Sequence, residues 1–197
     1  SNRLSQRKIP LENTNDAFDI VIPGKSLTEL SRSLTDEEEV ITIRIMDNQV
    51  LFETKTIKFY SRLLEGVYPD TNRLIPTNFN TVIEFEGKEF LSAIDRASLL
   101  SHEGRNNIVR LHIASDGVIL YGNSPEIGKV EESLNYNHVS GEPLDISFNP
   151  DYMKADLRAF GDKTIKIQFI SAIRQFILEQ SEGQGEFVQL ITPVRTN

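Results

Sequence analysis

One stretch of this chain occurs three times at a spacing of 63 residues, and this repetition constrains the fold more than any other feature. Residues 20–27 align with residues 83–90 and with residues 146–153. Each copy has a short alternating stretch, a glycine or proline, a pattern typical of a helix, and further alternating stretches. Repetition on this scale indicates a fold built from copies of one supersecondary unit, rather than around a single catalytic centre.

The order of elements within each copy is β-α-β-β-β. In the first copy we expect a strand at 19–22, a helix at 25–34 and strands at 40–45, 50–54 and 57–64. The second copy predicts a strand at 82–85, a helix at 88–100 and strands at 108–113, 118–121 and 129–136. The third predicts a strand from 144, a helix at 150–160 after the capping residue Asn149, and strands at 165–169, 175–178 and 187–191.

Two such units back to back would form one compact α+β domain, with antiparallel sheets outside and paired helices on one side. The second and third units fit this description, and the segment Pro76-Thr77-Asn78 is the best linker. We therefore divide the chain into an incomplete domain at 1–78 and a complete domain at 79–197. The first unit would be the second half of a preceding domain, so we expect the chain to be a fragment.

Composition excludes several classes of protein. The 197 residues contain no cysteine, which excludes disulfides and thiolate metal sites and favours an intracellular, cytoplasmic location. No apolar run approaches the ~18 residues of a membrane span. The net charge of −8 argues against bulk attraction to nucleic acid, but a local basic face stays compatible with it.

No catalytic constellation stands out. The histidines His102, His112 and His138 lie in different elements without the spacing of metal ligands, and no serine occupies a nucleophile elbow. We expect no enzyme activity, no metal and no cofactor.

Each predicted helix carries basic residues away from its apolar stripe. These residues are Lys25 and Arg32, Lys88 and Arg96, and Lys154 and Arg158. Any solvated helix exposes lysine and arginine, so a single stripe carries little weight. Three equivalent helices with the same arrangement favour a shared basic surface that contacts phosphates without reading bases.

Four segments carry a resemblance to a known family. They are residues 2–5 (NRLS), 63–76 (LLEGVYPDTNRLIP), 95–101 (DRASLLS) and 189–197 (QLITPVRTN). In these the chain resembles the bacterial sliding clamp, the beta subunit of DNA polymerase III, along its whole length, and its last residues resemble the clamps of low-GC Gram-positive bacteria. The resemblance implies three like domains per subunit, each a double β-α-β-β-β unit, and a head-to-tail homodimeric ring around duplex DNA.

The resemblance also implies roles for individual residues. The six basic residues named above would line the hole and contact DNA weakly. Leu99 and Leu100 match a subunit interface, beside an edge strand at 128–134. A groove for the Gln-x-x-Leu-Phe-like peptide of polymerases and the clamp loader would use Arg3, Leu4, Pro69, Arg73, Leu74, Leu190, Thr192, Pro193, Val194 and Arg195.

The predicted function is a DNA polymerase processivity factor, without chemistry of its own and without a membrane role. The alternative is a non-catalytic repeat scaffold that binds peptides and has no DNA role. An enzyme with an unrecognised site is the third class.

Overall fold

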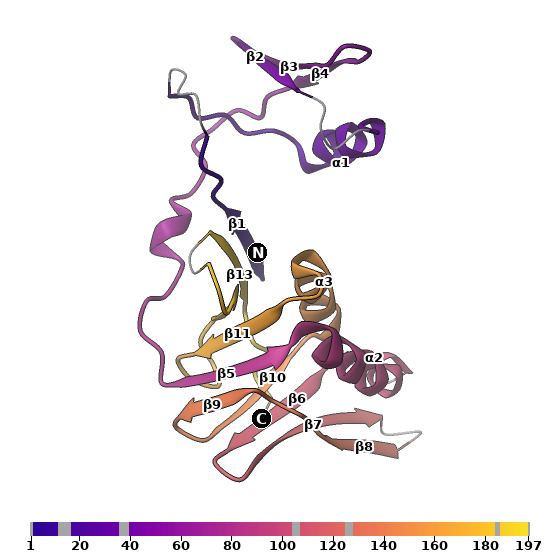
Figure 1. The fold of residues 1–197 in the computed structure, drawn as a ribbon, viewed down its shortest axis with the longest axis vertical. Helices are drawn as coiled ribbons and strands as arrows, with labels where there is room; N and C mark the ends of the chain where they lie inside the picture. Colours follow the sequence, from indigo (N-terminus) through magenta and orange to yellow (C-terminus); the bar gives the residue numbers. More distant parts are fainter. Residues whose placement is uncertain are drawn as a thin grey trace. The chain divides into compact units, whose positions relative to one another are not determined.

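A computed structural model describes residues 2–11, 17–35, 40–103, 107–124, 128–183 and 186–196; the side chains of residues 102 and 103 are also left undescribed. The chain forms two compact units (Figure 1). The large unit comprises Ser1–Pro10 and Thr71–Asn197, and the small unit comprises Leu11–Asp70. Residues 71–78, assigned to the first domain on sequence, thus lie in the large unit.

The large unit contains two copies of the repeat. The first has β5 (Thr81–Glu86), α2 (Gly87–Glu103), β6 (Val109–Ala114), β7 (Gly117–Ser124) and β8 (Gly128–Ser133), and is followed by β9 (His138–Gly141). The second has β10 (Leu144–Phe148), α3 (Pro150–Phe160), β11 (Thr164–Phe169), β12 (Phe176–Gln180) and β13 (Phe187–Ile191). The predicted α+β class, with antiparallel sheets and repeated β-α-β-β-β units, is confirmed.

The two copies exchange their first strands. Strand β10 pairs with β6, with Ile146 opposite Leu111, and β5 pairs with β11, with Ile83 opposite Ile167. One sheet therefore has the order β10-β6-β7-β8, and the other has β1-β13-β12-β11-β5-β9. Each copy completes the sheet of the other, which explains why one copy alone is not a domain.

Helices α2 and α3 lie side by side and cover the core (Figure 1). Both helices contribute apolar residues at helical spacing, among them Phe90 and Met153, to a single cluster with the inward faces of the strands. Phe85 stacks on Phe90 with ring centroids 4.2 Å apart. The start of α3 follows from Asn149, whose side chain accepts a hydrogen bond from the backbone N–H of Asp151.

The small unit is a single copy of the repeat. It has α1 (Gly24–Ser33) and an antiparallel sheet of β2 (Thr42–Met46), β3 (Gln49–Glu53) and β4 (Lys58–Arg62). Val50 and Phe52 of the central strand pack with Leu30 of α1. The helix begins after Pro23, which provides no side-chain cap.

Three features differ from the sequence expectations. The predicted strand at 19–22 joins no sheet among the described residues, because no described strand pairs with it. Strand β1 (Arg3–Arg7) was not predicted, since its polar sequence shows no apolar face; its partner β13 supplies the ladder. Strand β9 was likewise missed, and it pairs with β5. No helix in the described part of the chain is long and apolar enough to cross a membrane.

Candidate peptide groove and basic helix surface

An apolar cluster lies on the face of the six-stranded sheet that is opposite the main core, and we call it the groove cluster. Its buried members are Ile177 of β12 and Val188 and Leu190 of β13. Leu4 of β1 stands opposite Leu190, which stands opposite Ile177. Half-buried Leu4, Ile75 and Phe79 pack against the buried members.

The segment that carries Ile75 is tied to the neighbouring strands by polar contacts. It begins with a short 3-10 helix, η1 (Thr71–Arg73). The side-chain amide of Gln6 in β1 donates to Thr71 Oγ1 at 3.2 Å and to Asn72 Oδ1 at 3.1 Å. Leu74 follows with 47% of its surface exposed, so an apolar side chain is open to a ligand beside the cluster.

The C-terminal segment runs past the end of β13 and stays attached to the large unit. The N–H of Thr192 donates to the carbonyl of Asn2 at 2.9 Å, and that of Val194 donates to Ser147 at 2.8 Å. Pro193 is buried and Val194 half-buried, whereas Thr192 and Arg195 are exposed. The segment therefore offers both apolar and basic groups at a fixed position.

Arg3 connects β1 to α3. Its guanidinium lies 4.5 Å from the centroid of the Tyr152 ring. One turn further along α3, Asp156 is buried, and its Oδ2 has no hydrogen-bond partner. Burial raises the pKa of the Asp156 carboxyl to about 7, and the charge of Arg3 lowers it in part.

The large unit thus brings together most of the predicted groove residues: Leu4 and Leu190 inside the cluster, Arg73 and Leu74 on the adjoining segment, and Arg3 and residues 192–195 at the strand ends. Pro69 belongs to the small unit, where it is exposed. The sequence analysis missed Ile75, Phe79, Ile177 and Val188. The unbroken apolar run 176–178 was the available signal, because such runs are typical of strands buried on both faces.

The predicted basic surface is exposed at five of its six residues. Lys25 and Arg32 are exposed on α1 of the small unit. On α2, Lys88 lies 3.8 Å from Asp162, in a pair whose side chains are both more than three-quarters exposed. Arg96 of α2 makes two hydrogen bonds with Glu132 of β8. This hydrogen bonding to the carboxylate raises the pKa of the Arg96 guanidinium.

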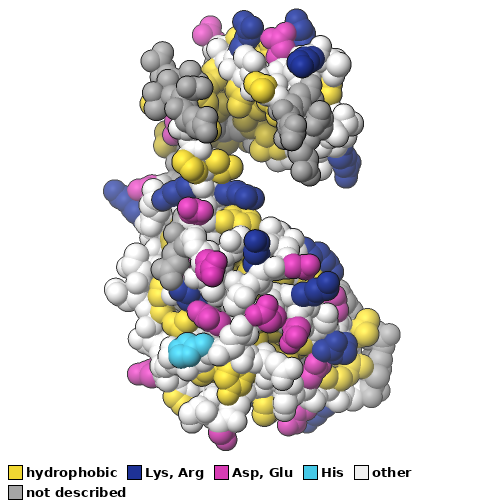
Figure 2. All heavy atoms as spheres, viewed as in Figure 1, with side chains coloured by type: hydrophobic (Ala, Val, Ile, Leu, Met, Phe, Trp, Pro, Cys, Tyr) yellow, Lys and Arg dark blue, Asp and Glu magenta, His cyan; other side chains and the backbone are white. Residues whose placement is uncertain are grey.

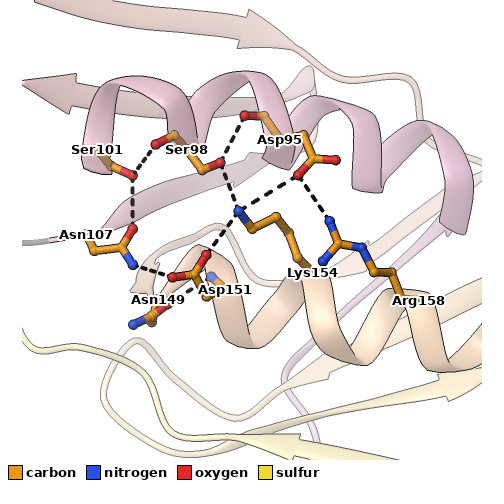
Figure 3. A network of polar contacts seen from close by, with 8 residues as sticks. All are labelled: Asp95, Ser98, Ser101, Asn107, Asn149, Asp151, Lys154 and Arg158. Carbon is orange, nitrogen blue, oxygen red and sulfur yellow. Dashed lines mark hydrogen bonds and ion pairs between the residues drawn. The ribbon is translucent and has the colours of Figure 1, made fainter. Parts of the chain in front are cut away.

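Lys154 corrects the expectation of an exposed stripe on α3, because it is buried to 9% exposure. Its Nζ lies 3.0 Å from Asp151 Oδ1 and 3.8 Å from Asp95 Oδ1, and it donates to Ser98 Oγ at 3.2 Å (Figure 3). The lysine points into the contact between α2 and α3, where a duplex cannot reach it. Arg158 remains exposed and lies 3.6 Å from Asp95.

The polar contacts of Lys154 continue through the helix pair. Asp151 Oδ2 accepts from the side-chain amide of Asn107 at 2.7 Å, and Asn107 Oδ1 accepts from Ser101 of α2 at 3.3 Å (Figure 3). Acidic and basic side chains also intermingle over the face of the large unit seen in Figure 2. The basic residues of α2 and α3 are therefore largely neutralised within the protein.

The predicted interface residues lie near a sheet edge. Leu99 of α2 is 70% exposed and Leu100 is half-buried. Strand β8 is the last strand of the four-stranded sheet, so one of its edges carries no partner strand in the described structure. Edge strands of this kind are ready-made templates for pairing with another chain.

Comparison with known proteins gives a consistent result. The sequence matches the family model for the central domain of the DNA polymerase III beta subunit over residues 1–70, and the model for its C-terminal domain over residues 72–195. Beta sliding clamps of Streptococcus pneumoniae and Bacillus subtilis are both 48% identical, over 197 and 198 residues, and cover 100% of this chain. The chain spans 52% of the length of each of these relatives.

Solved structures give the same assignment. The DNA polymerase III beta chain of Streptococcus pneumoniae matches with a TM-score of 0.94 and 48% identity, over 99% of this chain and 52% of that one. The sliding clamp of Bacillus subtilis matches with a TM-score of 0.93 and 47% identity, over 100% of this chain and 52% of that one.

Proposed function

This chain belongs to the family of DNA polymerase III beta subunits, the sliding clamps, and we propose that it serves in a processivity factor. The factor would encircle duplex DNA as a ring and hold the replicative polymerase on it. The groove cluster with its flanking basic residues is the observation that carries this proposal. It offers what a short apolar peptide needs, an apolar floor with polar and cationic groups at its rim.

The groove would bind a Gln-x-x-Leu-Phe-like peptide of the polymerases and the clamp loader. Exposed Leu74 and the half-buried Leu4 would receive the apolar side chains of the peptide, because Leu4 stands opposite the buried Leu190 and Leu74 precedes Ile75, which packs against the same cluster. Arg73 and Arg195 would lie at the rim and attract acidic residues that flank such a motif. Pro69, which the resemblance also assigns to the groove, belongs to the small unit.

The helices would contact the DNA backbone only weakly. The candidate contacts are Lys25, Arg32, Lys88, Arg96 and Arg158, and buried Lys154 is no longer among them. Exposed ion pairs such as that of Lys88 with Asp162 contribute little free energy, so a phosphate can replace the carboxylate and be released again. Weak and sequence-independent contact of this kind is compatible with sliding.

Ring closure would use the edge of β8 together with Leu99 and Leu100. A second subunit would add a strand to this edge and cover the exposed leucine. In this proposal the protein has no bond chemistry, since its role is to keep an enzyme close to its template.

The test is a titration of the intact chain with a fluorescent Gln-x-x-Leu-Phe peptide. We expect saturable binding that Arg73→Ala and Pro193→Ala each weaken at least about tenfold, equivalent to ~1.4 kcal/mol. Lys129→Ala is the matched control, because this exposed cation lies on β8 of the four-stranded sheet, which carries none of the predicted groove residues, and should leave affinity unchanged. Absence of binding, or equal affinity in all variants, would contradict the proposed groove.

A further inference from the structure

Charged side chains cross the seam between α2 and α3 in antiparallel order. Lys88 at the start of α2 lies beside Asp162, which follows the end of α3. Further along the seam, Asp95 of α2 lies beside Lys154 and Arg158 of α3 (Figure 3). Carboxylates therefore stand among the same cations that are proposed to meet DNA phosphates.

Asp95 serves two cations with one oxygen. Its Oδ1 lies 3.8 Å from Lys154 Nζ and 3.6 Å from Arg158 Nη2. The two cations differ in their access to solvent, because the Lys154 side chain is 11% exposed and the Arg158 side chain is 60% exposed. Asp95 itself is half exposed. A phosphate can therefore approach Arg158 and Asp95, whereas it cannot reach Lys154.

The pair of Asp95 with Arg158 is loose in comparison with another ion pair of α2. Its distance of 3.6 Å exceeds the length of a hydrogen bond between charged groups, which is about 2.7–2.9 Å. Arg96, in contrast, makes two hydrogen bonds with Glu132. Exposed ion pairs without such geometry contribute little free energy. Arg158 can therefore exchange its carboxylate for a phosphate more readily than Arg96 can.

Lys154 keeps the Asp95 carboxylate compensated during such an exchange. The ammonium of Lys154 is held from both helices, since it lies 3.0 Å from Asp151 Oδ1 and donates to Ser98 Oγ at 3.2 Å. A buried lysine needs partners of this kind, because burying an unpaired charge is costly. When Arg158 turns to a phosphate, Asp95 retains Lys154 as its counter-ion. Departure and return of Arg158 thus leave no carboxylate of this cluster without a cation.

We propose that Asp95 regulates the contact between the helices and DNA by competing with phosphate for Arg158. This role rests on the proposed contact of the helix surface with the DNA backbone, and it identifies the residue that limits the strength of that contact. Asp95 pairs with Arg158 between contacts and recaptures the guanidinium when a phosphate leaves. It is a positioning residue that keeps each contact weak and brief, as sliding requires.

NMR titration of the intact chain with a short DNA duplex tests this role. NMR detects weak contacts, so the chain need not encircle the duplex. At ~0.1 M salt we expect Asp95→Asn to raise the affinity about three- to fivefold and to steepen its salt dependence by up to about one phosphate contact. This variant should fold, because Lys154 retains Asp151. Asp95→Glu keeps the charge and should restore the affinity of the natural chain.

Asp145→Asn is the matched control, because it removes the same charge from an ion-paired aspartate on another face. Asp145 lies 3.1 Å from His112 and 3.9 Å from Arg110. It stands opposite His112 in the sheet, and the neighbours of His112 in β6, Leu111 and Ile113, point into the core that the helices cover. Asp145 therefore points away from the helices. Since salt screens charges over about 10 Å at this concentration, the control should bind like the natural chain.

A double-mutant cycle separates competition from simple repulsion. Repulsion of phosphate by Asp95 would persist without Arg158, whereas competition for Arg158 would not. Asp95→Asn should therefore gain no affinity in an Arg158→Ala background. A full gain in that background would overturn the role of Asp95, as would an equal gain in Asp145→Asn.

The proposed contact with DNA can fail separately from the role of Asp95. If no variant binds the duplex, or if Arg158→Ala and Lys88→Ala both bind as tightly as the natural chain, the helices do not contact DNA and both proposals are overturned. If Arg158→Ala weakens binding but Asp95→Asn leaves it unchanged, the contact stands and only the role of Asp95 is overturned.

Discussion

The large and small units share one repeat but differ in how completely they bury it. Leu27, Phe90 and Met153 occupy the same position in the three helices, and they are 44%, 2% and 0% exposed. The paired repeats of the large unit cover each other's apolar faces, whereas no described residue covers the equivalent face of the repeat in the small unit. A single β-α-β-β-β unit therefore forms its elements locally but needs a second unit to complete its core.

A neighbouring helix position shows the opposite behaviour. Leu30, Ala93 and Asp156 are equivalent by the 63-residue spacing, and all three are at least 94% buried. Burial here comes from the sheet of the same repeat and does not require the second one. The position accepts a carboxyl group only with a raised pKa, since the charged form loses its hydration.

The largest expected effect comes from truncating Leu111 of β6 and Ile43 of β2, which lie at the same distance from the two-residue turns of their hairpins. Leu111→Ala should lower the free energy of unfolding by about 3 kcal/mol, because it removes a fully buried side chain and leaves a cavity. Ile43→Ala should lower it by less than about 1 kcal/mol, because Ile43 is half exposed. Calorimetry and hydrogen exchange will assign each loss to its unit. Equal losses would mean that the face of β2 is covered in solution, and the contrast between the units would fail.

The second contrast concerns two lysines on helices of the two units. Lys154→Met should destabilise the large unit by about 2 kcal/mol, because it leaves Asp151 and Asp95 without their shared cation. Lys25→Met on exposed α1 should change stability by less than about 0.5 kcal/mol. Urea unfolding measures both variants. A neutral or stabilising Lys154→Met would show that packing alone holds α2 against α3.

The smallest effect is a dependence of stability on pH. In the folded chain the pKa of Asp156 is about 7, against an ordinary value of 3.8 for this carboxyl. Between these values the folded state holds a proton that the unfolded state has lost, so the free energy of unfolding falls as pH rises and stays low above the folded pKa. Asp156→Asn should remove this fall and gain about 1–2 kcal/mol over the natural chain near pH ~8, with little difference near pH ~4.

The control for this prediction is Asp162→Asn, at an exposed position. Thermal unfolding of both variants across this pH range measures the effect. Parallel pH profiles for Asp156→Asn and the natural chain would show that this carboxyl is not the source of the dependence.

The sequence by itself determined the repeat, the order of its elements, and the family, which the comparisons confirm. These follow from local rules. Apolar periodicity specifies strand or helix within about ten residues, and Asn149 followed by Pro150 specifies the start of α3 from its own neighbours. The sequence also assigned Leu4 and Leu190 to one groove, although only through the resemblance to the family, and the two residues stand opposite each other in β1 and β13.

Only the tertiary structure decided which strands find partners and which cations reach solvent. Segment 19–22 has the pattern of a strand but no ladder partner in the described structure, whereas the polar β1 becomes a strand because β13 offers an open edge. The pattern of its own helix predicts Lys154 to be a surface residue, but α2 packs against it and contributes Asp95 and Ser98 as its partners. Hydrogen-bond pairing and burial depend on elements distant in the chain, so local periodicity cannot specify them.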